Sequence, residues 1–124
     1  MNKKKLVIWE RELELPVDIM CYENEAITEI QKDAVEIFLT SSDLLTKVRK
    51  QVESYILQNQ VGENKIDEVD NIFKYVMPKS LFVPRVERRT VAVLCNYKFD
   101  LEHGLAIVFE EEQLKAIGAE DIVI

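Results

Sequence analysis

The spacing of apolar residues changes twice along this 124-residue chain, and that change limits the folds open to it. Near both ends apolar residues alternate with polar ones, which is the period of a half-buried β-strand. In the middle they recur three or four positions apart, which is the period of one helix face. This order predicts an α+β fold with N-terminal strands, three consecutive helices and a C-terminal antiparallel β-meander packed against the helices.

Residues that cap helix N-termini precede each predicted helix. Thr28 and Gln31 have the spacing of a capping box, and the apolar face of this helix comprises Ile27, Ile30, Ala34, Ile37 and Phe38. The TSSD stretch at 40–43 supplies caps for a second helix, whose face comprises Leu44, Val48, Val52, Tyr55 and Ile56. Asn64 caps a third helix, which Pro78 ends; its face comprises Ile66, Val69, Phe73 and Val76.

Alternation of apolar and polar residues predicts strands before and after the helices in the sequence. Residues 6–9 form an early strand, or the first half of a long bent one, before the alternating residues 13–22. After the helices, Pro84 indicates an edge strand or the end of a strand. The two best-defined strands have inward faces that comprise Val91, Val93, Cys95, Tyr97 and Phe99 in one and Leu105, Ile107 and Phe109 in the other.

Residues 110–118 can be interpreted in two ways. By propensity they form a helix that ends at a C-capping glycine. By context they form a tight turn at Glu111 and Glu112 followed by a strand at 114–117, because the preceding strand needs an antiparallel neighbour. We favour the strand, and we expect residues 121–124 to form a last extended piece on the sheet.

Composition places the chain among globular proteins. With 48% hydrophobic and 31% charged residues, we expect residues 1–124 to form one domain without a disulfide or structural metal. No apolar run reaches the length of a signal-peptide core or a membrane span, so we expect a cytoplasmic protein. Cys21 and Cys95 both lie in strand-like alternation, which favours buried free thiols.

Negative charge is concentrated at the C-terminal end. Of the net charge of −7, residues 100–124 carry −6. This excess disfavours nucleic acid as a partner, because phosphates would be repelled. It indicates either a solvated acidic face or a surface complementary to a basic protein partner.

Asp100, Glu102, His103 and Gly104 form the most distinctive cluster, and His103 is the only histidine. In the structural interpretation, Asp100 accepts backbone N–H bonds, Gly104 supplies a positive φ, and the histidine ring packs over a hairpin. This interpretation is the simpler one, because a metal site needs three or more converging ligands. A contact site for a ligand or protein is the functional alternative.

Catalytic motifs are lacking. The sequence contains no Gly-rich phosphate loop, no nucleophile elbow and no C-x-x-C pair. Cys95 with His103 is a poor nucleophile pair, because Cys95 is in phase with core residues. We therefore expect neither enzymatic activity nor a cofactor.

The densest basic cluster comprises Arg85, Arg88 and Arg89. Arginines in this arrangement can bind phosphate or a carboxylate on a partner. They can equally pair across strands with the acidic C-terminal segment, which is the interpretation that we favour.

The stretch NYKFDLEHGLAIVF, residues 96–109, resembles a family of small bacterial proteins known only as a domain of unknown function. The resemblance rests on Asp100, Glu102, His103 and Gly104 between two strands. It implies a bacterial cytoplasmic protein without established activity, and it suggests immunity proteins that neutralise toxins. Glu111 and Glu112 depart from the Asn-Gly pair expected in the last hairpin.

Three hypotheses about function follow. The first is a non-catalytic protein-interaction module that binds a basic protein through its acidic meander, with an immunity-like protein as the specific form suggested by the resemblance. The second is a divalent-metal or small-ligand site at Asp100, Glu102 and His103. The third is a homo-oligomer, such as a homodimer, formed through an edge strand near Pro84 or residues 122–124.

Overall fold

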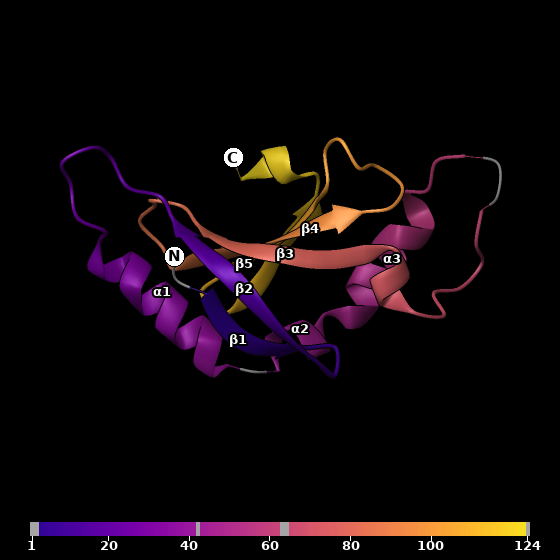
Figure 1. The fold of residues 1–124 in the computed structure, drawn as a ribbon, viewed down its shortest axis with the longest axis horizontal. Coiled ribbons are helices and arrows are strands. Elements are labelled where there is room, and N and C mark those ends of the chain that lie inside the picture. Colours follow the sequence, from indigo (N-terminus) through magenta and orange to yellow (C-terminus); the bar gives the residue numbers. More distant parts are fainter. Residues whose placement is uncertain (1–2, 42, 63–64, 124) are drawn as a thin grey trace.

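The computed structural model describes residues 3–41, 43–62 and 65–123. Six strands form one sheet in the order of the sequence (Figure 1). They are β1 (Lys3–Ile8), β2 (Arg11–Ile19), β3 (Val76–Val83), β4 (Thr90–Tyr97), β5 (Leu105–Glu110) and β6 (Gln113–Gly118). Strands β2 and β3 pair in parallel, and all other neighbours pair antiparallel. The α+β class and the C-terminal meander are confirmed.

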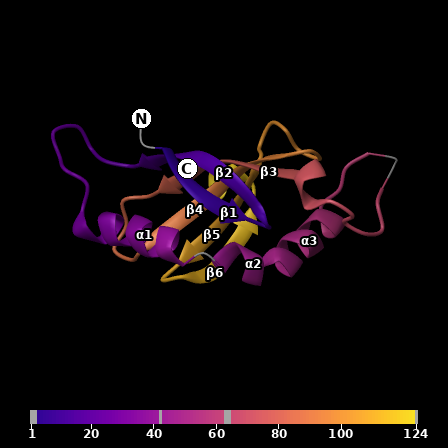
Figure 2. The same cartoon turned by 60° about the horizontal axis from the view of Figure 1, so that its bottom comes forward.

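The helices occupy the long connection between the two parallel strands, as such a crossover requires. They are α1 (Glu29–Thr40), α2 (Leu44–Lys47) and α3 (Arg49–Gln58). Figure 2 shows them in a row along one side of the sheet. None of these helices is long and apolar enough to span a membrane. We call the opposite side of the sheet, which they leave uncovered, the open face.

Helix α1 begins as the sequence predicts. Thr28 Oγ1 accepts a hydrogen bond from Gln31 N at 3.1 Å, and Thr28 N donates to Gln31 Oε1 at 2.9 Å, which completes the capping box. Gln31 is buried, and its Nε2 donates to Met20 O at 2.6 Å. The cap therefore also ties the helix to the chain leaving β2.

The second predicted helix is divided, and the third is absent from its predicted place. Val48 interrupts the helix with φ −102° and ψ 7°, although the apolar face continues through Val52 and Ile56. Beyond α3 the structure shows a loop and a short 3-10 helix, η1 (Ile72–Lys74). Gln60 bonds both the N–H and the C=O of Ile66, which satisfies backbone groups without a helix. The predicted cap Asn64 lies outside the described residues.

The C-terminal strands match their prediction in most respects. After β5 ends at Glu110, residues 111–118 form a turn and strand β6, and Glu111 and Glu112 both have positive φ, at 52° and 64°. The tail prediction is wrong, because Glu120–Ile122 form a 3-10 helix, η2, instead of an extended piece; Ile124 lies outside the described residues. Pro84 follows the end of β3, which is an internal strand, so this part of the chain offers no sheet edge.

Both faces of the central strands are apolar. The larger core lies between sheet and helices and includes Val93, Cys95 and Ile107. A smaller cluster lies on the open face and comprises Ala92, Leu94, Ala106 and Val108, with Phe82, Ala116 and Val123 against it. The two thiols are free, but only Cys95 is buried, so the prediction of a buried Cys21 is wrong. Strand β2 ends at Ile19, which leaves Cys21 in an exposed loop.

Candidate binding pocket on the open face of the sheet

The Asp100–Gly104 turn connects β4 to β5. Asp100 Oδ1 accepts a hydrogen bond from His103 N at 3.2 Å, and both Asp100 carboxylate oxygens lie 3.0 Å from His103 Nδ1. Gly104 has φ +64°, as predicted. The half-exposed His103 pairs with Asp100 instead of packing over the hairpin, and Glu102 is exposed. The turn thus uses its polar side chains to close itself.

The turn also holds the C-terminal segment. His103 O accepts a hydrogen bond from Glu120 N at 3.0 Å. The side chain of Glu120 lies against Gly104, where a Cβ atom would come within 2.8 Å of Glu120 Cδ. Lys79 Nζ lies 2.7 Å from Glu120 Oε1, as an ion pair out of alignment for a hydrogen bond. These contacts fix η2 beside the end of the sheet.

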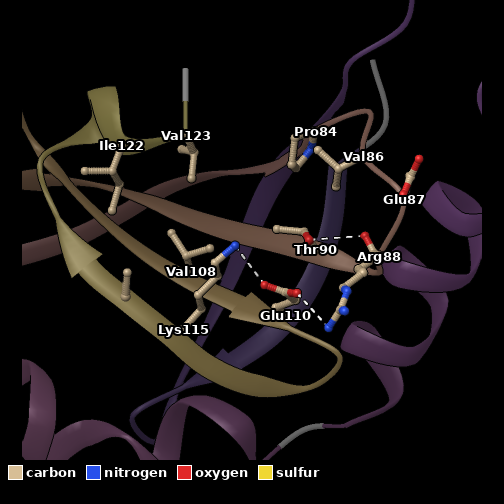
Figure 3. Close-up of a pocket in the computed structure, with 11 residues that line it drawn as sticks. Pro84, Val86, Glu87, Arg88, Thr90, Val108, Glu110, Lys115, Ile122 and Val123 are labelled. Atoms are coloured by element: carbon tan, nitrogen blue, oxygen red, sulfur yellow. Dashed lines mark hydrogen bonds and ion pairs between the residues drawn. The ribbon is translucent and has the colours of Figure 1, made fainter.

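A hollow on the open face lies between η2 and the β3–β4 loop (Figure 3). Ile122 and Val123 form one wall, and Pro84 and Val86 form the other. Thr90, Val108 and Ala116 form the floor. Its volume of about 340 Å³ is at the lower end of the range of roughly 300–1,000 Å³ typical of ligand sites. We refer to this feature as the hollow.

Charged side chains stand at one end of the hollow. Glu110 Oε2 lies 2.8 Å from Lys115 Nζ, and Glu110 Oε1 lies 3.5 Å from an Arg88 guanidinium nitrogen. Figure 3 shows Arg88 and Lys115 approaching Glu110 from opposite sides. The hydrogen bond from Lys115 lowers the pKa of Glu110, so this carboxylate is ionised at neutral pH.

The three arginines of the predicted basic cluster pair with four glutamates. Arg89 forms two hydrogen bonds with Glu112, at 2.9 and 2.8 Å, and also pairs with Glu111. Together with the Arg88 pair, this confirms the predicted cross-strand pairing with the acidic segment. Arg85 differs, because it pairs with Glu25 at 2.8 Å and donates to Ala26 O at 3.1 Å. Only Arg88 of the three arginines lines the hollow.

Much of the acidic C-terminal segment is engaged within the molecule. Glu110, Glu111, Glu112 and Glu120 all form ion pairs with lysine or arginine side chains. The concentration of negative charge in the sequence therefore overstates the charge that this segment presents to a partner.

Grouped metal ligands and the Cys95 thiol are two candidate reactive features that the structure allows us to inspect. Among residues 3–41, 43–62 and 65–123, no three His, Cys, Asp or Glu side chains are grouped to hold a metal ion. Burial, reinforced by the nearby charge of Glu120, raises the pKa of the Cys95 thiol far above its usual range. The thiolate is the reactive form of cysteine, and a thiol with a raised pKa stays protonated. Cys95 is therefore an unreactive residue of the buried core.

Sequence reasoning missed the hollow, although one signal was present. Residues 91–95 and 105–109 are apolar at every position, which is typical of strands covered on both faces. The helices can cover only one of those faces. The second apolar face includes Ala92, Ala106 and Val108. The continuous apolar runs therefore indicated that loops or a partner cover this face.

Comparison with curated proteins and comparison with solved structures each give no match. One family model matches residues 2–124, which is nearly the whole chain, and the family is described as a domain of unknown function. The resemblance to a family of unknown function is confirmed at that level. The chain belongs to the family described as domain of unknown function DUF6985.

Proposed function

We propose that this protein is a non-catalytic interaction module that binds a segment of a partner protein in the hollow. The observation that carries the proposal is a pair of exposed apolar side chains on opposite walls. Val86 is 46% exposed and Ile122 is 47% exposed, on either side of a floor that includes Val108 and Ala116. Covering apolar surface from water is the main favourable term in most protein association.

A protein segment suits this surface better than a small molecule. A ligand confined to the hollow leaves the outer sides of Val86 and Ile122 in water. A partner surface that spans both walls removes them from water, which is worth about 1 kcal/mol for each half-exposed side chain. The partner contributes an apolar side chain to the hollow as an anchor, and its flanking residues cover the walls.

Selection from a library of random peptides displayed on phage tests the proposal. The wild-type protein is compared with the double variant Val86→Ser/Ile122→Ser, which removes the exposed apolar side chain from each wall; its circular dichroism spectrum checks that the fold is kept. The matched control is Val61→Ser/Leu101→Ser, because these apolar side chains are also exposed but do not line the hollow. We expect the same peptides to be enriched on the wild type and the control, and to be lost on the wall variant.

Two results would overturn the proposal. One is a set of peptides that binds the wall variant as well as it binds the wild type. The other is light scattering that shows a wild-type dimer and a monomeric wall variant, which would assign the hollow to a second copy of this chain.

A further inference from the structure

The charges at the end of the hollow are unequal. Arg88 and Lys115 share one carboxylate, that of Glu110, which leaves one positive charge in excess among these three groups. Glu87 also lines the hollow, but its carboxylate points away from it in Figure 3. The carboxylate of Glu111, which lines an adjoining groove, pairs with Arg89 at 2.9 Å. An anionic group placed beside Arg88 and Lys115 is therefore attracted to this end of the hollow.

A second depression of the surface lies next to the charged end of the hollow. A second groove shares Arg88, Glu110 and Lys115 with the hollow and extends to Glu111 and Gln113 at the β5–β6 turn. The two depressions therefore adjoin at these three residues, and we call the pair the track; Val108 lines its apolar end, and Glu111 and Gln113 line its polar end. An elongated ligand fits such a track better than a compact one.

The spacing along the track matches that of an extended chain. Val108 and Glu110 are two residues apart on β5, and both line the hollow. Residues at positions i and i+2 of a strand lie on one side, roughly 7 Å apart. A second extended segment laid along β5 repeats this spacing, so alternate side chains reach the apolar floor and the paired cations.

We infer that the bound segment is extended and carries an apolar side chain two positions from an Asp or Glu side chain. The inference rests on the proposed function and specifies the chemistry of its partner. The apolar side chain fills the hollow between Val86 and Ile122. The acidic side chain takes a place beside Arg88 and Lys115.

The composition of the selected peptides tests the inference. The charge variant is Arg88→Gln/Lys115→Gln, and the matched control is Lys47→Gln/Lys74→Gln, which changes the net charge equally. The exposed fractions of these side chains are similar, at 70% and 59% against 68% and 56%, and all four form ion pairs. Neither control lysine lines the hollow.

We expect the wild type and the control to enrich peptides with an apolar residue, any residue, and then Asp or Glu. On the charge variant this acidic preference disappears. A peptide selected on the wild type binds the charge variant roughly 2- to 30-fold more weakly, the range for the loss of two exposed ion pairs. The difference shrinks as salt concentration rises.

The experiment distinguishes failure of this inference from failure of the proposed function. Apolar peptides that require Val86 and Ile122 but show no acidic preference overturn this inference and leave the proposed function standing. Peptides that are indifferent to the wall variant overturn both.

Discussion

Gly104 and Glu120 are packed so closely that a Cβ atom at 104 would force its neighbours to shift. The Cβ atom of any other residue at 104 would lie 2.8 Å from Glu120 Cδ and 2.9 Å from Cys95 O. The neighbouring backbone adds the hydrogen bond from Glu120 N to His103 O. The most distinctive motif of the sequence therefore has a structural role, because it positions η2, and η2 forms one wall of the hollow.

Gly104→Ala is expected to destabilise the protein by about 2 kcal/mol or more. The left-handed backbone costs an alanine roughly 1–2 kcal/mol, and overpacking against Glu120 adds to this. Denaturant unfolding measures the change, with Gly62→Ala as the control. Gly62 also has positive φ, at +107°, but has open space where a Cβ atom would lie. Equal losses at the two glycines would show that the close contacts with Glu120 and Cys95 O contribute nothing.

Lys79→Met is expected to loosen η2. Without the ammonium group, the partly buried carboxylate of Glu120 has no other cation within ion-pair distance among the described residues. Hydrogen exchange then accelerates at the amides of Glu120 and Ile122, while amides of β4 keep their protection. Adding Glu120→Gln removes the uncompensated charge and should restore part of the protection. Unchanged exchange at Glu120 would contradict a role for Lys79 in holding this segment.

His103 is expected to titrate above its ordinary range. The hydrogen bond and the charge of Asp100 raise the pKa of His103, and the hydrogen bond from His103 N lowers the pKa of Asp100. The histidine contribution to stability is complete at low pH and is lost as pH rises through the raised pKa. The aspartate contribution is lost as pH falls through the lowered pKa, so the pair stabilises the turn between these two values.

NMR titration of the single histidine measures this effect directly. Asp100→Asn should return the pKa of His103 toward its ordinary value, and Glu102→Gln should change it less, because Glu102 acts only through its charge. A pKa of His103 that does not respond to Asp100→Asn would contradict the geometry of the turn.

The two thiols are expected to react at very different rates. Cys21 is exposed, whereas Cys95 is buried and burial raises its pKa. Alkylation followed by mass spectrometry should show one rapid modification, which Cys21→Ser abolishes. The second modification, at Cys95, should occur only when the protein unfolds. Rapid double modification under native conditions would be inconsistent with Cys95 in the core.

The sequence predicted those elements whose residues satisfy local rules. The capping box at Thr28, the alternation around Cys95 and the hairpin turn at Glu111 each depend on neighbours in the chain, and each is confirmed. The predicted helix at 66–76 is wrong although its apolar spacing is helical. Ile66 and Phe73 pack against the core from a loop and a 3-10 helix, and tertiary packing can bury apolar residues at any spacing.

The hollow was beyond sequence reasoning for a related reason. Its walls come from the β3–β4 loop and from η2, which lie more than thirty residues apart between Val86 and Ile122. The η2 wall is held in place because Glu120 contacts Lys79 and Gly104, and no local pattern encodes those distant contacts. The apolar second face of β4 and β5 is the one part of the site that the sequence signals, because residues 91–95 and 105–109 are apolar at every position.

The most direct test of the binding hollow is an NMR shift map of the protein titrated with a peptide selected on it. We expect the backbone amides of Thr90, Val108, Ala116 and Val123 to shift, and the helical side of the sheet to remain unchanged. Shifts confined to the helices or to the β1–β2 hairpin, with those four amides unmoved, would contradict a binding site on the open face.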